Sequence, residues 1–182
     1  MIVAKTVLTF ILSINLASAG CLAEYIQSIN PKAPAHRIEA AVLQAVKPIS
    51  AEHPYRVHPY VIMAIIKNES HFKPDVGKNY VGAHGLMQIK RRWHEQSLVK
   101  AMMYTDSLDL DNIETNVMTG TEAYRNMIRE AKGNRALAVA YYSQNRNQRD
   151  VLGASKGYRL RMERTISDLM RVCGGPMPPR YV

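Results

Sequence analysis

The sequence has no internal repeat, no low-complexity segment and no strand-rich region, which argues against a repeat protein and against a mainly-β fold. Beyond residue 19 it also lacks an apolar run of the roughly 20 residues that a membrane-spanning helix needs. Hydrophobic residues make up 47% of the 182 residues and charged residues 21%, which is typical of a globular protein and excludes a disordered chain. We therefore expect one domain of ordinary size.

Acidic residues are in short supply, with 15 Asp and Glu against 24 Lys and Arg, and the formal net charge is +9. A basic surface attracts polyanions such as nucleic acid, anionic lipid or a cell-wall polymer. The basic residues are scattered, however, and only Lys90–Arg92 are contiguous. Because no nucleic-acid-binding motif accompanies them, we expect no nucleic-acid partner and interpret Lys90–Arg92 as a solvated face.

The N-terminus has the pattern of a secretory signal peptide over residues 1–19. Lys5 supplies the positive charge, Val7–Leu16 is mainly apolar, and Ala17–Ala19 has the small residues of a cleavage site. The mature chain would then begin at Gly20. We expect export to the periplasm and no transmembrane segment in the mature chain. Secretion to the extracellular space and an uncleaved anchor are the alternatives.

The two cysteines, Cys21 and Cys173, lie just after the expected cleavage site and at the end of the last helical pattern. Since an exported protein with an even number of cysteines favours pairing, we expect a disulfide between them. A loop this long would give a stabilisation on the order of 4–5 kcal/mol in the chain-entropy model. The alternative is a lipid anchor on Cys21. That anchor would leave Cys173 unpaired, and it usually follows Leu at the position that Ser18 occupies here.

Apolar residues recur at helical spacing along most of the remaining chain. They predict helices at about 22–29, 35–49, from 59 to before Pro74, from 86, and at 113–131, 135–144 and 158–172. A glycine-rich loop is expected at 75–85, where a small β element is compatible with the pattern. Residues 105–111 should form an acidic turn and residues 145–157 a polar loop. The expected fold class is mainly α.

Glu69 is the most informative acidic residue because it continues the apolar stripe of Ile62, Ile65 and Ile66 at helical spacing. Burial beside apolar side chains raises the pKa of a carboxyl group. A carboxyl that stays protonated near neutral pH can act as a general acid on a glycosidic oxygen. A surface ion pair with a neighbouring lysine is the competing interpretation.

Four segments together indicate a family. Glu69–Pro74 and Gly82–Ile89 resemble the two signature motifs of the soluble lytic transglycosylases, Glu-Ser-x-Phe-x-Pro and Gly-Ala-x-Gly-Leu-Met-Gln. Asn116–Gly120 resembles a third element, Asn-hydrophobic-x-x-Gly, and Ala140–Tyr141 the start of an Ala-Tyr-Asn element. The resemblance covers about residues 51–170.

This resemblance implies a lysozyme-like α fold of the kind found in goose-type lysozyme and the SLT domain. The domain would span 51–173, with a helical segment at 20–50 packed on it and a flexible tail at 174–182. The implied reaction is cleavage of the MurNAc–GlcNAc β-1,4 bond of peptidoglycan to a 1,6-anhydro sugar. Glu69 would be the only acid and base, so no second carboxylate, metal or cofactor is expected.

The resemblance also implies which residues contact the glycan: Ser70, Asn79, Gly82, Met87, Gln88, Tyr141 and Tyr142. Tyr141 would lie close to Glu69. Two of these positions depart from the family pattern. Asn79 replaces a serine that often bonds the catalytic glutamate, and Tyr142 replaces the asparagine of the Ala-Tyr-Asn element.

Two other functions remain open at this stage. One is a hydrolytic muramidase on the same fold, and the other is a non-enzymatic peptidoglycan-binding assembly factor. A small exported domain of this kind could act as a monomer for a secretion or conjugation apparatus, or for a phage.

Overall fold

The computed structural model describes residues 20–47, 55–76, 82–143 and 151–175. The expected signal peptide at 1–19, Asn79 and most of the expected tail lie outside these residues. The elements are α1 (Cys21–Ile29), α2 (Ala35–Ala45), α3 (Pro59–Ser70), β1 (Ala83–His84), β2 (Ile89–Lys90), α4 (Arg91–Thr105), α5 (Ile113–Glu130), α6 (Arg135–Ser143), α7 (Val151–Ala154) and α8 (Lys156–Cys173). The predicted mainly α-helical fold class is confirmed.

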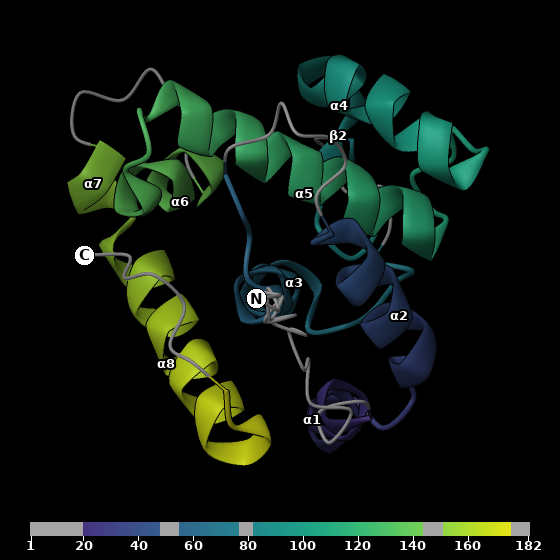
Figure 1. Cartoon of the computed structure of the whole chain (residues 1–182), viewed down its shortest axis with the longest axis vertical. Coiled ribbons are helices and arrows are strands. Elements are labelled where there is room, and N and C mark those ends of the chain that lie inside the picture. Colours follow the sequence, from purple (N-terminus) through teal and green to yellow (C-terminus); the bar gives the residue numbers. More distant parts are fainter. Residues whose placement is uncertain (1–19, 48–54, 77–81, 144–150, 176–182) are drawn as a thin grey trace, which may run out of the picture.

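Helix α3 is the central element of the fold. Figure 1 looks along its axis and shows α1, α2, α5 and α8 around it. Pro59 occupies the first turn, where its missing N–H costs nothing, and the His58 ring accepts a hydrogen bond from the Tyr60 N–H at 3.2 Å. Every residue from Tyr60 to Ile66 is buried, so the helix is apolar on all sides. It ends where His71 takes a left-handed conformation with φ of 52°.

Helix α2 ends at Ala45 and not at the predicted Ile49. Its last carbonyl groups are satisfied from α5, because the buried Arg125 donates to the Ala45 oxygen at 2.8 Å and to the Lys47 oxygen at 3.2 Å. Arg125 is also ion-paired with the buried Glu122. This contact fastens the N-terminal helices to the long helix α5.

A disulfide joins Cys21 at the start of α1 to Cys173 at the end of α8, with a Cα–Cα distance of 5.7 Å. The predicted pairing is confirmed, and the alternative of a lipid on Cys21 does not fit this structure. Because 152 residues separate the two cysteines, the bond closes nearly the whole described chain. The disulfide holds α8 against α1, and α8 also packs on α3.

The helix predicted from residue 86 begins only at Arg91, and this prediction was wrong for the residues before it. Instead, β1 and β2 form a short antiparallel hairpin in which Ala83 pairs with Lys90. Gly85 and Gln88 have φ values of +64° and +48°, and a helix cannot contain these left-handed residues. The loop predicted at 145–157 was wrong in part, since α7 lies within it and α8 begins before its end.

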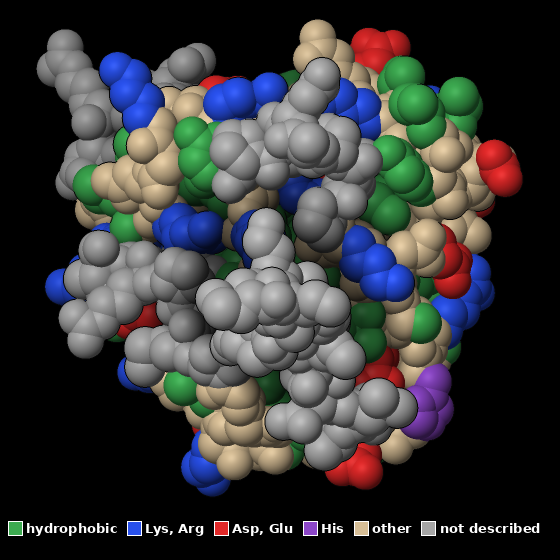
Figure 2. Space-filling view, in the orientation of Figure 1, with side chains coloured by type: hydrophobic (Ala, Val, Ile, Leu, Met, Phe, Trp, Pro, Cys, Tyr) green, Lys and Arg blue, Asp and Glu red, His purple; other side chains and the backbone are tan. Residues whose placement is uncertain are grey.

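Hydrophobic side chains gather at the upper right of the face seen in Figure 2, over helix α4. Its exposed apolar residues include Trp93, Val99 and Met103. The helix is kinked at His94, so its first turn is separate from the rest. None of the described helices is long and apolar enough to cross a membrane.

Candidate active site

Glu69 lies in the last turn of α3 and is half-buried. Its Oε1 accepts a hydrogen bond of 2.8 Å from the Tyr158 hydroxyl, which comes from the first turn of α8. Burial raises the pKa of Glu69 above its ordinary value, while the bond from Tyr158 and the charges of Arg161 and Lys90 act in the opposite direction. Glu69 is therefore protonated more readily than an exposed glutamate, while Tyr158, Arg161 and Lys90 stabilise its ionised form.

The first two turns of α8 contact the last turn of α3 at two points. Besides the Tyr158–Glu69 bond, the Arg161 Nε donates to the Asn68 Oδ1 at 2.9 Å. The Arg161 guanidinium also lies 5.8 Å from the centre of the Tyr158 ring. These contacts hold the phenol in place over the carboxyl group of Glu69.

The glycine loop between β1 and β2 is held by Asn116 of α5. The Asn116 Nδ2 donates to the carbonyl oxygens of His84 and Leu110, both at 2.8 Å, and its Oδ1 accepts from the Met87 N–H at 2.8 Å. A Cβ on Gly85 would lie 2.4 Å from this Nδ2, so only glycine fits there. Asn116, from the element Asn116–Gly120, thus holds the motif Gly82–Ile89 in place directly.

Gly120, one turn further along α5, makes room for Met87. A Cβ on Gly120 would lie 2.4 Å from the Met87 Sδ, which real Cβ atoms essentially never approach so closely. Met87 is fully buried as a result. Its side chain packs inside the protein, and its backbone carbonyl accepts a hydrogen bond from Tyr142.

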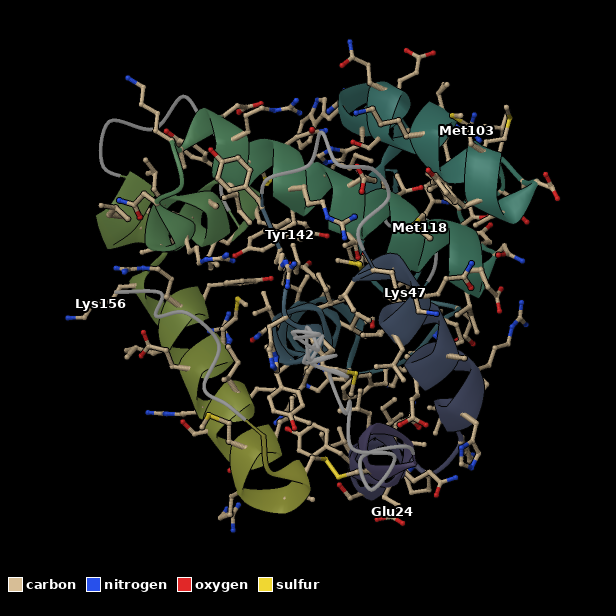
Figure 3. The ribbon with its side chains drawn as sticks, in the orientation of Figure 1. Glu24, Lys47, Met103, Met118, Tyr142 and Lys156 are labelled. Carbon is tan, nitrogen blue, oxygen red and sulfur yellow. A yellow bond between two sulfur atoms is a disulfide. The ribbon has the colours of Figure 1, made fainter. Side chains whose placement is uncertain are left out.

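Tyr142 at the end of α6 donates from its hydroxyl to the Met87 carbonyl at 2.8 Å. Figure 3 shows Tyr142 directed into the space between α5, α6 and the central α3. Burial raises the pKa of Tyr142 and of Tyr158 well above the ordinary value, and the charge of Glu69 adds to both shifts. Both phenols therefore stay protonated and can donate hydrogen bonds beside Glu69.

Gln88 has a left-handed backbone conformation. The Nε2 of its side-chain amide donates to the carbonyl oxygens of Gly85 at 2.9 Å and Val76 at 3.1 Å. It is half-buried. Gln88 thus ties the glycine loop to the segment that follows α3. This places the second motif next to the end of the first.

The family model of the transglycosylase SLT domain matches residues 47–159 of the chain. The protein belongs to the transglycosylase SLT family. No curated protein and no solved structure matched the chain. The matched span of the SLT domain contains α3, the hairpin, α5, α6 and Tyr158, and the membership agrees with the lysozyme-like α fold expected from the sequence. Members of this family act on peptidoglycan outside the cytoplasm.

The other residues that the motifs imply occupy different settings in the SLT domain. Ser70 is buried, and its hydroxyl donates to the Ile66 carbonyl at 3.1 Å. Gly82 is exposed with φ of +65°, and Tyr141 is half-buried against the core. Asn79 lies outside the described residues. Contact of these residues with a glycan stays a prediction.

Sequence reasoning missed Tyr158, which was placed only as the start of the last helix. In the structure its hydroxyl hydrogen-bonds Glu69, and the closeness of Tyr141 to Glu69 stays a prediction. Tyr158 and Glu69 are 89 positions apart, and no local pattern marks their contact. A search for a phenol on the helix packed against the end of α3 would have found it.

The protein also has a hollow of about 850 Å³ whose lining includes Arg37, Asp75, Asp109 and Asp111, but not Glu69. Asp75 is the acidic residue nearest to Glu69 in the sequence, and it faces this hollow. Among the described residues, no other carboxylate shifts the pKa of Glu69. The described ranges contain no group of three or more His, Cys, Asp or Glu side chains placed to hold a metal ion.

Proposed function

We propose that the protein is a peptidoglycan lytic transglycosylase that cleaves the MurNAc–GlcNAc β-1,4 bond without water. Glu69 is its single acid and base. The observation that carries this proposal is the setting of Glu69: a half-buried carboxyl with a raised pKa, bonded to Tyr158, with no second described carboxylate acting on it. A glycosidase that uses water needs a second carboxylate in most families.

In the first step, the protonated Glu69 gives its proton to the glycosidic oxygen, and the bond from that oxygen to the anomeric carbon of MurNAc breaks. The leaving sugar departs as an alcohol, and positive charge develops on the MurNAc ring. The raised pKa of Glu69 favours this step, because it increases the protonated fraction of the carboxyl relative to an exposed glutamate.

In the second step, the ionised Glu69 takes the proton of the MurNAc C6 hydroxyl, whose oxygen bonds to the anomeric carbon and closes the 1,6-anhydro ring. The carboxylate must be stable enough to exist between the two steps. The hydrogen bond from Tyr158 and the charges of Arg161 and Lys90 supply this stabilisation, since all three lower the pKa of Glu69. The proton taken from the C6 hydroxyl returns Glu69 to its protonated starting state.

Tyr142 and the hairpin shape the wall of the site beside Glu69. The hydroxyl of Tyr142 is engaged with the Met87 carbonyl, so its ring forms a rigid surface. Gly82, Gln88 and Tyr141 are proposed to contact the glycan, with Ser70 and Met87 supporting them from inside.

Product analysis tests the proposal against hydrolysis. Purified protein is incubated with sacculi, and the soluble muropeptides are identified by mass spectrometry. The proposal predicts 1,6-anhydro-MurNAc ends, and it predicts that Glu69→Gln releases none. Reducing MurNAc ends would instead indicate a hydrolytic muramidase. The absence of any product, with binding to sacculi retained, would favour a non-enzymatic assembly factor.

We further propose that the protein acts in the periplasm after removal of residues 1–19. In this compartment a single small domain would open the wall locally for a secretion, conjugation or phage apparatus. The disulfide supports an oxidising compartment. N-terminal sequencing of the exported protein would test the cleavage before Gly20, and sedimentation would test the expected monomer.

A further inference from the structure

Trp93 is the only tryptophan of the chain, and 57% of its surface is exposed. Two cations lie against its ring. The Lys90 Nζ is 4.3 Å and the Arg92 Cζ 4.9 Å from the ring centre. These cation–π contacts hold two otherwise mobile cationic side chains in one place beside an exposed indole. Such an arrangement favours ligand binding, because its charged groups are already positioned.

Neither of these cations has an acidic partner in the parts of the chain that the structure describes. The ion pairs found there belong to Arg37, Arg125 and Arg171 and to two histidines. The neighbouring Arg91 differs, since it donates to the Leu108 carbonyl at 2.6 Å. The run Lys90–Arg92, expected to be a plain solvated face, therefore contains two cations held in place but not neutralised.

The position of this cluster connects it with the candidate active site. Lys90 ends strand β2, two residues after Gln88, and it is half-buried. Its charge lies near enough to Glu69 to lower the pKa of that carboxyl. Trp93 follows in the first turn of α4, which the kink at His94 separates from the rest of the helix. Lys90, Arg92 and Trp93 thus lie at the edge of the candidate active site, on the side formed by the hairpin.

The proposed function tells which part of the substrate would meet these cations. The sugar rings of peptidoglycan carry hydroxyl and amide groups and no charge, because the lactyl group of MurNAc is joined to the peptide as an amide. The free carboxylates belong to the peptides that hang from MurNAc. Resting on the proposed function, we propose that Lys90, Arg92 and Trp93 form a subsite that binds the peptide carboxylates of the glycan strand being cleaved.

In this subsite the ammonium and guanidinium groups donate hydrogen bonds to the carboxylates, and the exposed indole contacts the apolar part of the peptide. Contact with Trp93 restricts both cations before the substrate arrives, which lowers the entropy lost on binding. The subsite acts on binding and orientation. The proton transfers remain with Glu69.

The test compares soluble peptide-bearing glycan oligomers with the same oligomers after their carboxylates have been converted to amides. The rate of anhydro product formation at low substrate concentration is measured for each. We expect the protein to prefer free carboxylates by about fivefold, the size of two partly exposed charge contacts. Lys90→Met/Arg92→Met should bring the ratio of rates close to unity. Using a ratio cancels the effect of Lys90 on the pKa of Glu69.

The matched control is Lys100→Met/Arg164→Met, which also removes one lysine and one arginine but neither of the two that contact the Trp93 ring, and it should keep the preference of the original protein. A preference that survives in Lys90→Met/Arg92→Met, or that falls equally in the control, would overturn the subsite. The absence of anhydro product from both substrates would instead overturn the proposed function, and the subsite with it.

Trp93 offers a second readout that needs no catalysis and no variant, because the chain has no other tryptophan. Its fluorescence is followed while a disaccharide peptide with free carboxylates is added, and then its amidated form. A saturable change with the first, weaker with the second, supports the subsite. Equal responses, or none, contradict it.

Discussion

The contact between Gly120 and Met87 gives a prediction whose size follows from the structure. In Gly120→Ala, the new Cβ would lie 2.4, 2.7 and 2.9 Å from three Met87 atoms, where ordinary contacts are 3.4–4 Å. Met87 would have to move by about 1 Å within a close-packed core, and such overpacking costs about 1–3 kcal/mol. Alanine in a helix regains up to about 1 kcal/mol. We therefore expect a net loss of about 0–2 kcal/mol in the free energy of unfolding.

Gly157→Ala is the matched control, since a Cβ there meets only the end of Arg161 at 3.7 Å. In urea unfolding followed by circular dichroism, Gly120→Ala should be less stable than this control by about 1–3 kcal/mol. A displaced Met87 also moves the carbonyl that Tyr142 bonds, so the rate on sacculi should fall by about 10- to 100-fold.

A double-mutant cycle isolates the contact. Met87→Ala alone should cost about 2–5 kcal/mol, because it leaves a cavity in the core. Adding Gly120→Ala to it should then cost nothing or stabilise, with a coupling energy of about 1 kcal/mol or more. Equal stability and equal rates for Gly120→Ala and Gly157→Ala would refute the reasoning that Gly120 is required for the position of Met87.

Three further predictions concern Glu69 and the disulfide. Tyr158→Phe removes a bond that lowers the pKa of Glu69, so that pKa should rise further and the alkaline limb of the pH–rate profile should move to higher pH; an unmoved limb would contradict the bond. Because burial raises the pKa of Glu69 from 4.5, its ionisation costs stability as the pH rises through the folded-state pKa. Glu69→Gln should therefore be more stable than the original protein near neutral pH, and the gain should vanish at acidic pH in thermal unfolding; a gain independent of pH would contradict this. In urea unfolding without reductant, the free energy of unfolding of Cys21→Ser/Cys173→Ser should be roughly 4–5 kcal/mol lower than that of the original protein. Equal stability of the two proteins would contradict this.

The helices were predictable because their evidence is local. The apolar stripe of Ile62, Ile65 and Ile66 predicted α3, and the spacing of apolar residues predicted α5 and α8 to within a few residues. The disulfide was also predictable, since an even count in an exported chain leaves one pairing.

The helix expected from residue 86 was misplaced for a physical reason, although a small β element near the glycine loop was compatible with the sequence. The residues from Leu86 onward have apolar spacing that suits a helix, but Gly85 and Gln88 take left-handed conformations there. These conformations are imposed from outside by Asn116, which bonds three backbone groups of the loop and its surroundings. A residue 29 positions away decides the local structure, and a local pattern cannot show this.

The partner of Glu69 was missed for a similar reason. The contact of Tyr158 with Glu69 depends on how α8 packs against α3, and the Arg161–Asn68 bond joins the same two helices. The family element pointed to Tyr141, whose closeness to Glu69 stays a prediction. The structure adds Tyr158, which bonds Glu69, and Tyr142, which bonds the Met87 carbonyl.

The central claim, that Glu69 breaks the glycan without using water, is tested most directly by digesting sacculi in water labelled with heavy oxygen. The account predicts anhydro ends that carry no label in the reaction of the original protein, and no new ends with Glu69→Gln. Label at the anomeric carbon of the new MurNAc ends would show that water attacks there, and it would contradict the account.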